Sequence, residues 1–494
     1  MSREILVNVN ALETRVALLD AGVLCELIVQ RTDRQGLVGN IYLGRVNRVL
    51  PGMQAAFVEI GLERTAFLHV SDMITTPRSE EGATIPPIQS LLHEGEQVLV
   101  QIVKDPLGSK GARLTTQISI PSRFLVLRPD ASDVGVSVRI EDEAERERLK
   151  GMLRGLIEEE VAQQPTGKAA GGYIIRTAGE GICEDDLRAD MQFLNKLWAW
   201  IQAQAAAAEP GTMVHGDLPL VMRILRDMIG IPVDRVRIDS EADCSRVMRF
   251  AERFVPEMAG HIEHYLGKSP IFDLYGVEEE LQRALQRKVP LKSGGHLVFD
   301  QTEALTTVDV NTGGFVGHRN LEETVFKTNL EATHVIARQL RLRNLGGIII
   351  VDFIDMASED HRAQVLSALN AALEEDPART SVGQYSSLGL VELTRKRTRE
   401  SLEHILCEPC AVCNGRGTVK TVETICLDIF REIQRSSSQF QAKGLMVLAN
   451  PDVIDMLLDE QSAPLAELET QLGQPIRLQA EQLYIQEEYD VVLL

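Results

Sequence analysis

The stretch TTVDVNTGG, residues 306 to 314, places two oxygen-bearing side chains two positions apart. Valines alternate with polar residues there, as in a half-buried strand, so Asp309 and Asn311 would share one face of a sheet. The run LGGIIIVDFIDM, residues 345 to 356, predicts a second strand that ends at Asp352. If the two strands are neighbours, two carboxylates and an amide meet at one place.

Such a group has the chemistry of a magnesium site. Carboxylate and amide oxygens are hard ligands, and Mg²⁺ shares the rest of its coordination shell with water and substrate phosphate. Asp355 adds a further carboxylate nearby in the sequence. The pattern therefore favours metal-assisted hydrolysis of a phosphodiester. The alternative is an ordinary polar sheet edge, with Asp352 capping a turn.

A cluster of cysteines suggests a second metal. In HILCEPCAVCNGRGT, residues 404 to 418, Cys410 and Cys413 are followed by two glycines, as in a zinc-binding turn. A structural zinc ion needs four ligands, and the chain has no second Cys-x-x-Cys pair. Either His404 and Cys407 complete the site, or a second copy of the chain does. An iron–sulfur cluster competes weakly, because a fourth cysteine is missing.

Aromatic and basic residues suggest contact with nucleic acid. From Gly39 to about Ile120, apolar and polar residues alternate in short segments that are separated by glycines. This pattern predicts a small β-barrel. Phe57 and Phe67 lie within it, and Lys110 lies near its end. Rings and lysines on a barrel can stack bases and bind phosphates. Alternatively, both rings belong to the barrel core.

A predicted strand at 173 to 176 ends in Arg176 and Thr177, whose guanidinium and hydroxyl groups could bind a phosphate. Gly179 and Gly181 follow, but no Lys-Ser/Thr pair completes a P-loop.

Charge and composition limit the possible functions. The 494 residues carry a formal net charge of -21, which argues against indiscriminate nucleic-acid binding. Residues 445 to 494 alone contribute about -9, which suggests a role in assembly rather than in nucleic-acid binding. Basic residues gather at 338 to 344 and 395 to 400, and could hold a polyanion if they face one groove. With no signal-peptide core, long apolar stretch or disulfide framework, we expect a cytoplasmic protein without membrane contact.

The remaining pattern predicts a multidomain α/β protein. Strands are expected over residues 3 to 30 and a long helix over 185 to 208, followed by a mainly helical region to 290. An α/β region follows, with a helix over 322 to 344. The apolar run from Ile348 to Val351 predicts a strand buried on both faces.

Several long motifs together resemble one known family. They include AAFVEIGLERTAFL, IIRTAGEG, LTTVDVNTGG, IARQLRLRNLGGIIIVDFIDM, GLVELTRKRTRESLEH and CNGRGTVKTVET. The chain is similar to the ribonuclease E/G family of bacterial endoribonucleases from end to end, without the long scaffold of the family's larger members. The resemblance implies an RNase H-like domain in two parts (1–35 and 216–284), an S1-type OB-fold RNA-binding domain (36–120), a 5′-sensor domain (121–215), a DNase I-like catalytic domain (285–403), a zinc link (404–418) and a small C-terminal oligomerisation domain (419–494).

The resemblance also implies roles for particular residues. Asp309 and Asp352 match the family's magnesium-binding aspartates, and Asn311 matches the asparagine that joins them in the catalytic site. The implied 5′-monophosphate pocket consists of Arg176, Thr177, Val126 and Arg379. The implied RNA-binding residues of the barrel are Phe57, Phe67 and Lys110.

Three positions depart from the family pattern, namely Ser122, Val138 and Cys407. Ser122 and Val138 stand where the larger members have glycine and arginine, with Arg139 next to the second. Cys410 and Cys413 match the pair that shares one zinc ion between two protomers, and Cys407 is extra, either a spare thiol or a third ligand.

The implied activity is magnesium-dependent cleavage of single-stranded, A/U-rich RNA, stimulated by a 5′-monophosphate and leaving 5′-phosphate and 3′-hydroxyl ends. The expected substrates are ribosomal RNA precursors, notably the 5′ end of 16S rRNA, and some messenger RNAs, and the expected assembly is a homodimer or a dimer of dimers. The alternatives are a non-catalytic RNA-binding protein with structural aspartates and a metal-dependent phosphatase of small molecules.

Overall fold

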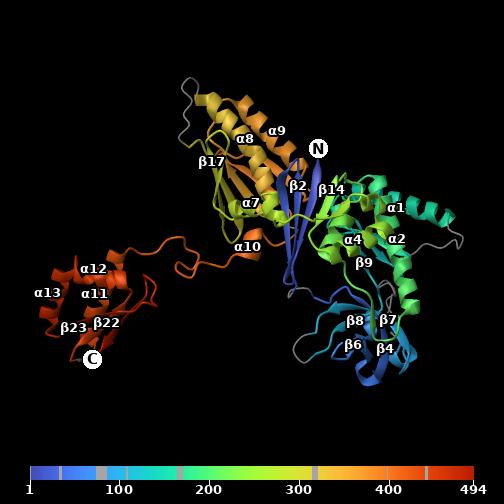
Figure 1. The fold of residues 1–494 in the computed structure, drawn as a ribbon, viewed down its shortest axis with the longest axis horizontal. Coiled ribbons are helices and arrows are strands. Elements are labelled where there is room, and N and C mark those ends of the chain that lie inside the picture. The colour runs from blue at the N-terminus through green and yellow to red at the C-terminus, as the bar shows by residue number, and fades with distance from the viewer. Residues whose placement is uncertain are drawn as a thin grey trace. The chain divides into compact units, whose positions relative to one another are not determined.

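The computed structural model describes residues 2–32, 36–73, 86–106, 110–163, 171–313, 321–397, 399–439 and 443–494. Gly314, the last residue of the TTVDVNTGG stretch, lies outside them. The chain divides into two compact units, Met1–Ile405 and Leu406–Leu494, each described below by itself (Figure 1). The prediction of a mixed α/β protein with several domains is confirmed.

Segments far apart in the sequence form the first sheet of the larger unit. Its strand order is β15-β14-β1-β2-β3, in which β1, β2 and β3 are antiparallel and β14 and β15 run parallel to β1. The N-terminal strand β1 therefore pairs with a strand more than 200 residues later in the sequence. The bounds are β1 Arg3–Val9, β2 Glu13–Asp20, β3 Val23–Arg31, β14 Arg235–Ile238 and β15 Ile262–His264, with helices α3 Leu220–Asp227, α4 Glu241–Phe254, α5 Pro256–Ala259, α6 Ile271–Leu274 and α7 Val277–Ala284.

The predicted small barrel is confirmed. Five strands close in the order β4-β5-β6-β8-β7, because the first half of β4 pairs with β7 while its second half pairs with β5. Gly44 allows this tight closure, since a Cβ there would lie 2.5 Å from Val58. The bounds are β4 Ile41–Leu50, β5 Ala55–Glu59, β6 Ala66–His69, β7 Gln97–Lys104 and β8 Arg113–Thr115, and β13 Thr212–His215 joins the outer edge of β4.

A small sheet with two long helices follows the barrel. Its order is β11-β12-β10-β9, and apolar residues of both helices join its core. The expected long helix at 185 to 208 is observed as α2. The bounds are β9 Ile120–Pro121, β10 Leu125–Arg128, β11 Val134–Val136, β12 Gly172–Ile175, α1 Glu143–Gln163 and α2 Glu184–Ala207.

The sheet that carries the aspartates has six strands in the order β16-β17-β18-β19-β21-β20. Helices α8 and α9 pack on one face, where they share a core with the inward residues of β17, β18, β19 and β21 (Figure 1). The bounds are β16 Lys288–Pro290, β17 His296–Gln301, β18 Leu305–Asn311, β19 Gly347–Asp352, β20 Thr380–Tyr385, β21 Val391–Arg395, α8 Leu321–Leu342, α9 Glu359–Glu374 and α10 Leu402–Leu406.

The prediction that residues 348 to 351 form a strand buried on both faces is wrong. Ile349 and Val351 are buried under the helices, but Ile348 is 51% exposed on the other face, and Ile350 is only partly buried. No described helix shares a hydrophobic core with that face. An unbroken apolar run in the sequence can therefore belong to a strand that is buried on one face only.

The smaller unit is a three-stranded sheet with three helices. Its strand order is β23-β22-β24, and Ile425, Ile429 and Ile433 form a stripe at helical spacing that packs on β22. The bounds are α11 Val422–Gln439, β22 Leu445–Ala449, α12 Pro451–Leu458, α13 Ser462–Leu472, β23 Ile476–Ala480 and β24 Tyr489–Leu493. Among the described helices of the whole chain, none combines the length and apolarity that crossing a membrane requires.

Candidate active site and its RNA-facing surroundings

The two aspartates of the predicted magnesium site lie directly beside each other. Strands β18 and β19 are adjacent and parallel, and their register pairs Asp309 with Asp352. Both side chains are exposed, on the face of the sheet opposite α8 and α9. The alternation of valine and polar residues in β18 produces this arrangement, because it buries Val308 and Val310 and turns Asp309 outward.

Electrostatics couples the carboxylates. Burial raises the pKa of Asp352, and the charges of Asp309 and Asp355 raise it further, because each disfavours a second negative charge nearby. Asn311 lies on the same face and donates its Nδ2 to Oδ2 of Asp309 at 2.8 Å. The amide therefore orients one carboxylate of the pair.

The loop after Asp352 is held by a residue that the sequence reasoning missed. Asn329 is fully buried in α8, and its amide bonds both backbone groups of Ile354, with distances of 2.8 Å to the carbonyl and 3.1 Å from the N–H. These bonds fix the backbone between Asp352 and Asp355. The available signal was an asparagine at an apolar position of an amphipathic helix.

The donor set suits magnesium better than a metal that requires a complete protein cage. Among the described residues, no three His, Cys, Asp or Glu side chains gather closely enough to form a metal site. Mg²⁺ needs only one or two carboxylates, because water and substrate phosphate fill its other positions. The repelling pair Asp309 and Asp352 fits that requirement.

Three of the four predicted 5′-phosphate residues line one cavity. Arg176, Thr177 and Arg379 surround a cavity of about 770 Å³, and Arg379 forms an ion pair with Glu180 at 2.5 Å. Val126 is not among the lining residues. The cavity also includes basic residues that the sequence reasoning did not assign to it, namely Arg139, Lys396 and Arg397.

The two departures from the family pattern have different consequences. Val138 is 86% exposed, while its neighbour Arg139 lines the cavity and adds a cation there. Ser122 is fully buried and does not line the cavity. Its carbonyl accepts a hydrogen bond from Arg176, and its hydroxyl donates to Asp190 at 2.5 Å. Ser122 therefore positions Arg176 from behind.

The barrel presents its two phenylalanines outward. Phe57 and Phe67 are opposite each other on β5 and β6, with ring centroids 6.1 Å apart in an edge-to-face arrangement. Both are only partly buried and neither belongs to the barrel core, so the alternative of core residues is wrong. Lys110 is exposed. The register of β4 and β5 also places Arg48 opposite Phe57.

Each of the two basic runs contains an arginine that is buried and so is not free to bind a polyanion. In the first, Arg343 is buried, with its guanidinium 4.6 Å from the ring centre of Phe299. In the second, the side chain of Arg395 is 4% exposed and pairs with Asp376 at 2.7 Å. These arginines stabilise the fold, because a buried guanidinium needs its partners inside the protein.

The backbone of the cysteine turn is left-handed at three positions. Asn414, Gly415 and Gly417 have φ angles of 49°, 81° and 76°, a conformation that glycine adopts without strain and asparagine tolerates better than most residues. The N–H groups of Cys413 and Val412 lower the pKa of the Cys410 thiol. Cys407 is exposed.

Comparison with known proteins agrees with this architecture. Residues 119–398 match the model of the Ribonuclease E/G family, and residues 409–493 match the RNase E/G thioredoxin-like domain, a description that the sequence reasoning had not reached. The chain therefore belongs to the ribonuclease E/G family. It is 53% identical to ribonuclease G of Salmonella typhimurium strain SL1344 over 100% of both chains, and 49% identical to ribonuclease G of Haemophilus influenzae over 99% of both. It is 35% identical to ribonuclease E of Escherichia coli K12 over 93% of this chain and 43% of that protein.

Proposed function

We propose that this chain is a magnesium-dependent endoribonuclease that cleaves single-stranded, A/U-rich RNA and leaves 5′-phosphate and 3′-hydroxyl ends. The observation that carries the proposal is the register of two parallel strands, which sets Asp309 directly opposite Asp352 on an exposed sheet face. Membership of the ribonuclease E/G family supports the hydrolytic class of the reaction.

The site residues have different roles in the proposed reaction. Asp309 and Asp352 hold Mg²⁺, and Asn311 keeps the first of them in place. Magnesium bound there supplies polarisation of a phosphoryl oxygen and a bound water of lowered pKa. Phe57 and Phe67 stack on unpaired bases, which favours single strands over duplexes, and Lys110 attracts the backbone.

The cavity around Arg176 recognises a 5′-monophosphate. Guanidinium groups from Arg176, Arg139 and Arg379 offer fork-shaped donors to phosphate oxygens, and the hydroxyl of Thr177 offers another donor. A terminal phosphate would compete with Glu180 for Arg379. Stimulation by a 5′-monophosphate follows, because a held terminus orients the strand for cleavage.

Substrates and assembly complete the proposal. The RNAs are ribosomal RNA precursors, notably at the 5′ end of 16S rRNA, together with some messenger and transfer RNA precursors in the cytoplasm. Cys410 and Cys413 supply half of a tetrahedral zinc site, and a second copy of the chain supplies the other half. The assembly is a homodimer or a dimer of dimers.

The decisive experiment compares cleavage of a short A/U-rich RNA by the native chain, Asp309→Asn and Asp300→Asn, each with Mg²⁺ or EDTA. Asp300 is a matched control, because it lies on the same sheet but pairs with Arg287. We expect Asp309→Asn to lower kcat/KM about 100-fold or more with RNA binding retained. Asp300→Asn should remain active. Native chain that binds RNA tightly without cutting it would instead favour a non-catalytic RNA-binding protein.

A further inference from the structure

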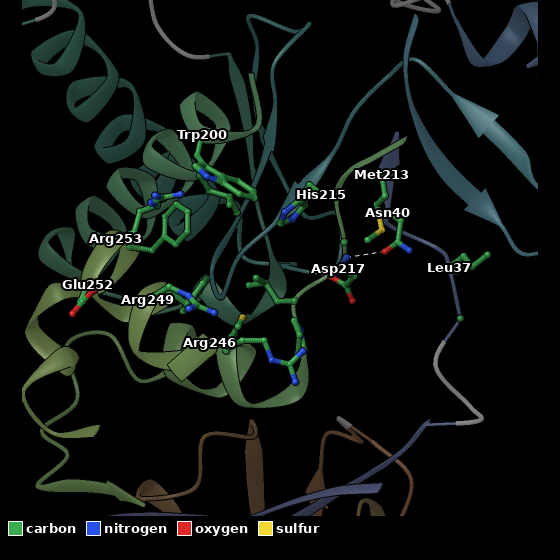
Figure 2. Close-up of a pocket in the computed structure, with 18 of the residues that line it drawn as sticks. Leu37, Asn40, Trp200, Met213, His215, Asp217, Arg246, Arg249, Glu252 and Arg253 are labelled. Carbon is green, nitrogen blue, oxygen red and sulfur yellow. Dashed lines mark hydrogen bonds between the residues drawn. The ribbon is translucent and has the colours of Figure 1, made fainter. Parts of the chain in front are cut away.

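A second cavity, unrelated to the aspartates and to the 5′-phosphate residues, lies within the larger unit. Its volume is about 1190 Å³, enough for a nucleotide. Helix α2 contributes Trp200, β13 contributes His215, and α4 contributes three arginines (Figure 2). The predicted functional residues do not line it.

One wall of the cavity is aromatic. The Trp200 ring lies 6.0 Å from His215 and 6.0 Å from Phe254, in both cases nearly perpendicular. Burial lowers the pKa of His215 to about 4, so this ring is uncharged at neutral pH. The indole Nε1 is buried and has no hydrogen-bond partner among the described residues. Because this N–H is shielded from solvent, the part of Trp200 that a ligand can contact is its partly exposed ring.

The neighbouring part of the wall is basic. Arg246, Arg249 and Arg253 follow one another at helical spacing on α4, so they share one face. Arg246 pairs with Asp243, and Arg253 lies 5.9 Å from the ring centre of Trp200. Arg249 lies between them and takes part in no ion pair within the described part of the chain.

The acidic residues of the cavity leave Arg249 accessible to an anion. Asp217 pairs with Arg223 at 3.5 Å. Glu252 points away from Arg249 at the rim (Figure 2). A guanidinium without a carboxylate partner, in a cavity that a partly exposed indole also lines, matches an aromatic ligand that carries a negative group.

We propose that this cavity binds a nucleoside phosphate, either as a free nucleotide or as one nucleotide of an RNA strand. The base lies against the Trp200 ring, and the phosphate lies at Arg249. The site is separate from the catalytic aspartates, so its occupancy does not depend on cleavage.

The test uses the full chain in EDTA, with AMP, UMP and a 5′-hydroxyl A/U hexanucleotide as ligands and tryptophan fluorescence as the signal. The chain has two tryptophans, Trp198 and Trp200. We expect ligand to quench the fluorescence of the native chain and of Trp198→Phe but not of Trp200→Phe. Arg249→Gln should weaken binding about tenfold or more. Arg283→Gln, a matched loss of charge at an exposed arginine that pairs with Glu279 and lines neither cavity, should bind as the native chain does.

The three ligands distinguish a site for a free nucleotide from a site for one nucleotide of an RNA strand. Quenching by AMP or UMP supports a free-nucleotide site, and quenching by the hexanucleotide alone supports a site for RNA. Absence of a Trp200 signal with all three ligands, or equal binding by the native chain and Arg249→Gln, would overturn the proposal. Arg253→Gln serves as a second variant if Arg249→Gln proves unfolded by circular dichroism.

Discussion

His215 gives the protein a stability that depends on pH. Its pKa is about 4 in the folded chain, against about 6.5 for an unperturbed histidine. Between these values the unfolded chain binds more protons than the folded chain, so the free energy of unfolding must fall as the pH falls from 6.5 to 4. Above pH 6.5 this contribution is complete and constant.

We therefore expect the free energy of unfolding of His215→Phe to fall less steeply than that of the native chain as the pH falls from 6.5 to 4. The two slopes should differ by at most about 1.4 kcal/mol per pH unit. Urea unfolding at pH 4, 5, 6 and 7 measures both slopes. The exposed residue His93 provides the control, because His93→Phe should follow the native curve. If His215→Phe also follows it, burial does not keep His215 neutral.

Ser122→Ala tests how much a buried hydroxyl contributes to the free energy of unfolding. The hydroxyl of Ser122 donates to Asp190, a buried carboxylate that also accepts two backbone N–H groups at 2.9 Å. Ser122→Ala leaves one oxygen of Asp190 short of a donor, so we expect a loss of about 1–3 kcal/mol in the free energy of unfolding. Ser90→Ala, at an exposed serine, should cost less than about 0.5 kcal/mol. Equal losses for the two variants would show that the Ser122 hydroxyl is unimportant.

At the scale of elements, α8 supports the active site through Asn329. Asn329→Ala breaks both bonds to Ile354, so the loop from Asp352 to Asp355 loses its anchor. We expect kcat to fall about 10- to 100-fold and the half-maximal Mg²⁺ concentration to rise. Asn370→Ala on α9, which removes a bond within an exposed helix surface, is the control. A variant that is less stable but has an unchanged Mg²⁺ requirement would restrict Asn329 to a structural role.

The elements also show how far sequence reasoning reaches. Period-two alternation predicted the outward turn of Asp309, because a strand alone decides which side chains share a face. It left open whether Phe57 and Phe67 point outward or into the barrel core. The run Ile348 to Val351 has no such alternation, so only the packing of α8 and α9 could show which face is covered. The burial of Arg343 and the arginine-lined cavity at Trp200 likewise depend on tertiary contacts.

At the scale of the whole molecule, the acidic charge of the smaller unit and the zinc site proposed for it predict that this unit serves assembly. Ten of its last fifty residues are acidic, and Arg477 is the only basic residue among them. Phosphates would be repelled there. Deletion of residues 445–494 should therefore alter the oligomeric state more than the affinity for RNA. Loss of RNA affinity with the oligomer intact would contradict this assignment.

Zinc should hold copies of the chain together without being needed for the fold of either unit. The core of the smaller unit consists of apolar residues of α11, α12, α13 and its sheet, and none of the clustered cysteines contributes to it. Removal of zinc with a strong chelator, or Cys410→Ser, should therefore halve the mass measured by sedimentation while the thermal transition persists. Cys407→Ser, the matched cysteine change, should keep the native mass if two protomers share the ion through Cys410 and Cys413. An equal loss of mass in Cys407→Ser would make Cys407 a third ligand, and an unchanged mass in Cys410→Ser would remove zinc from the interface.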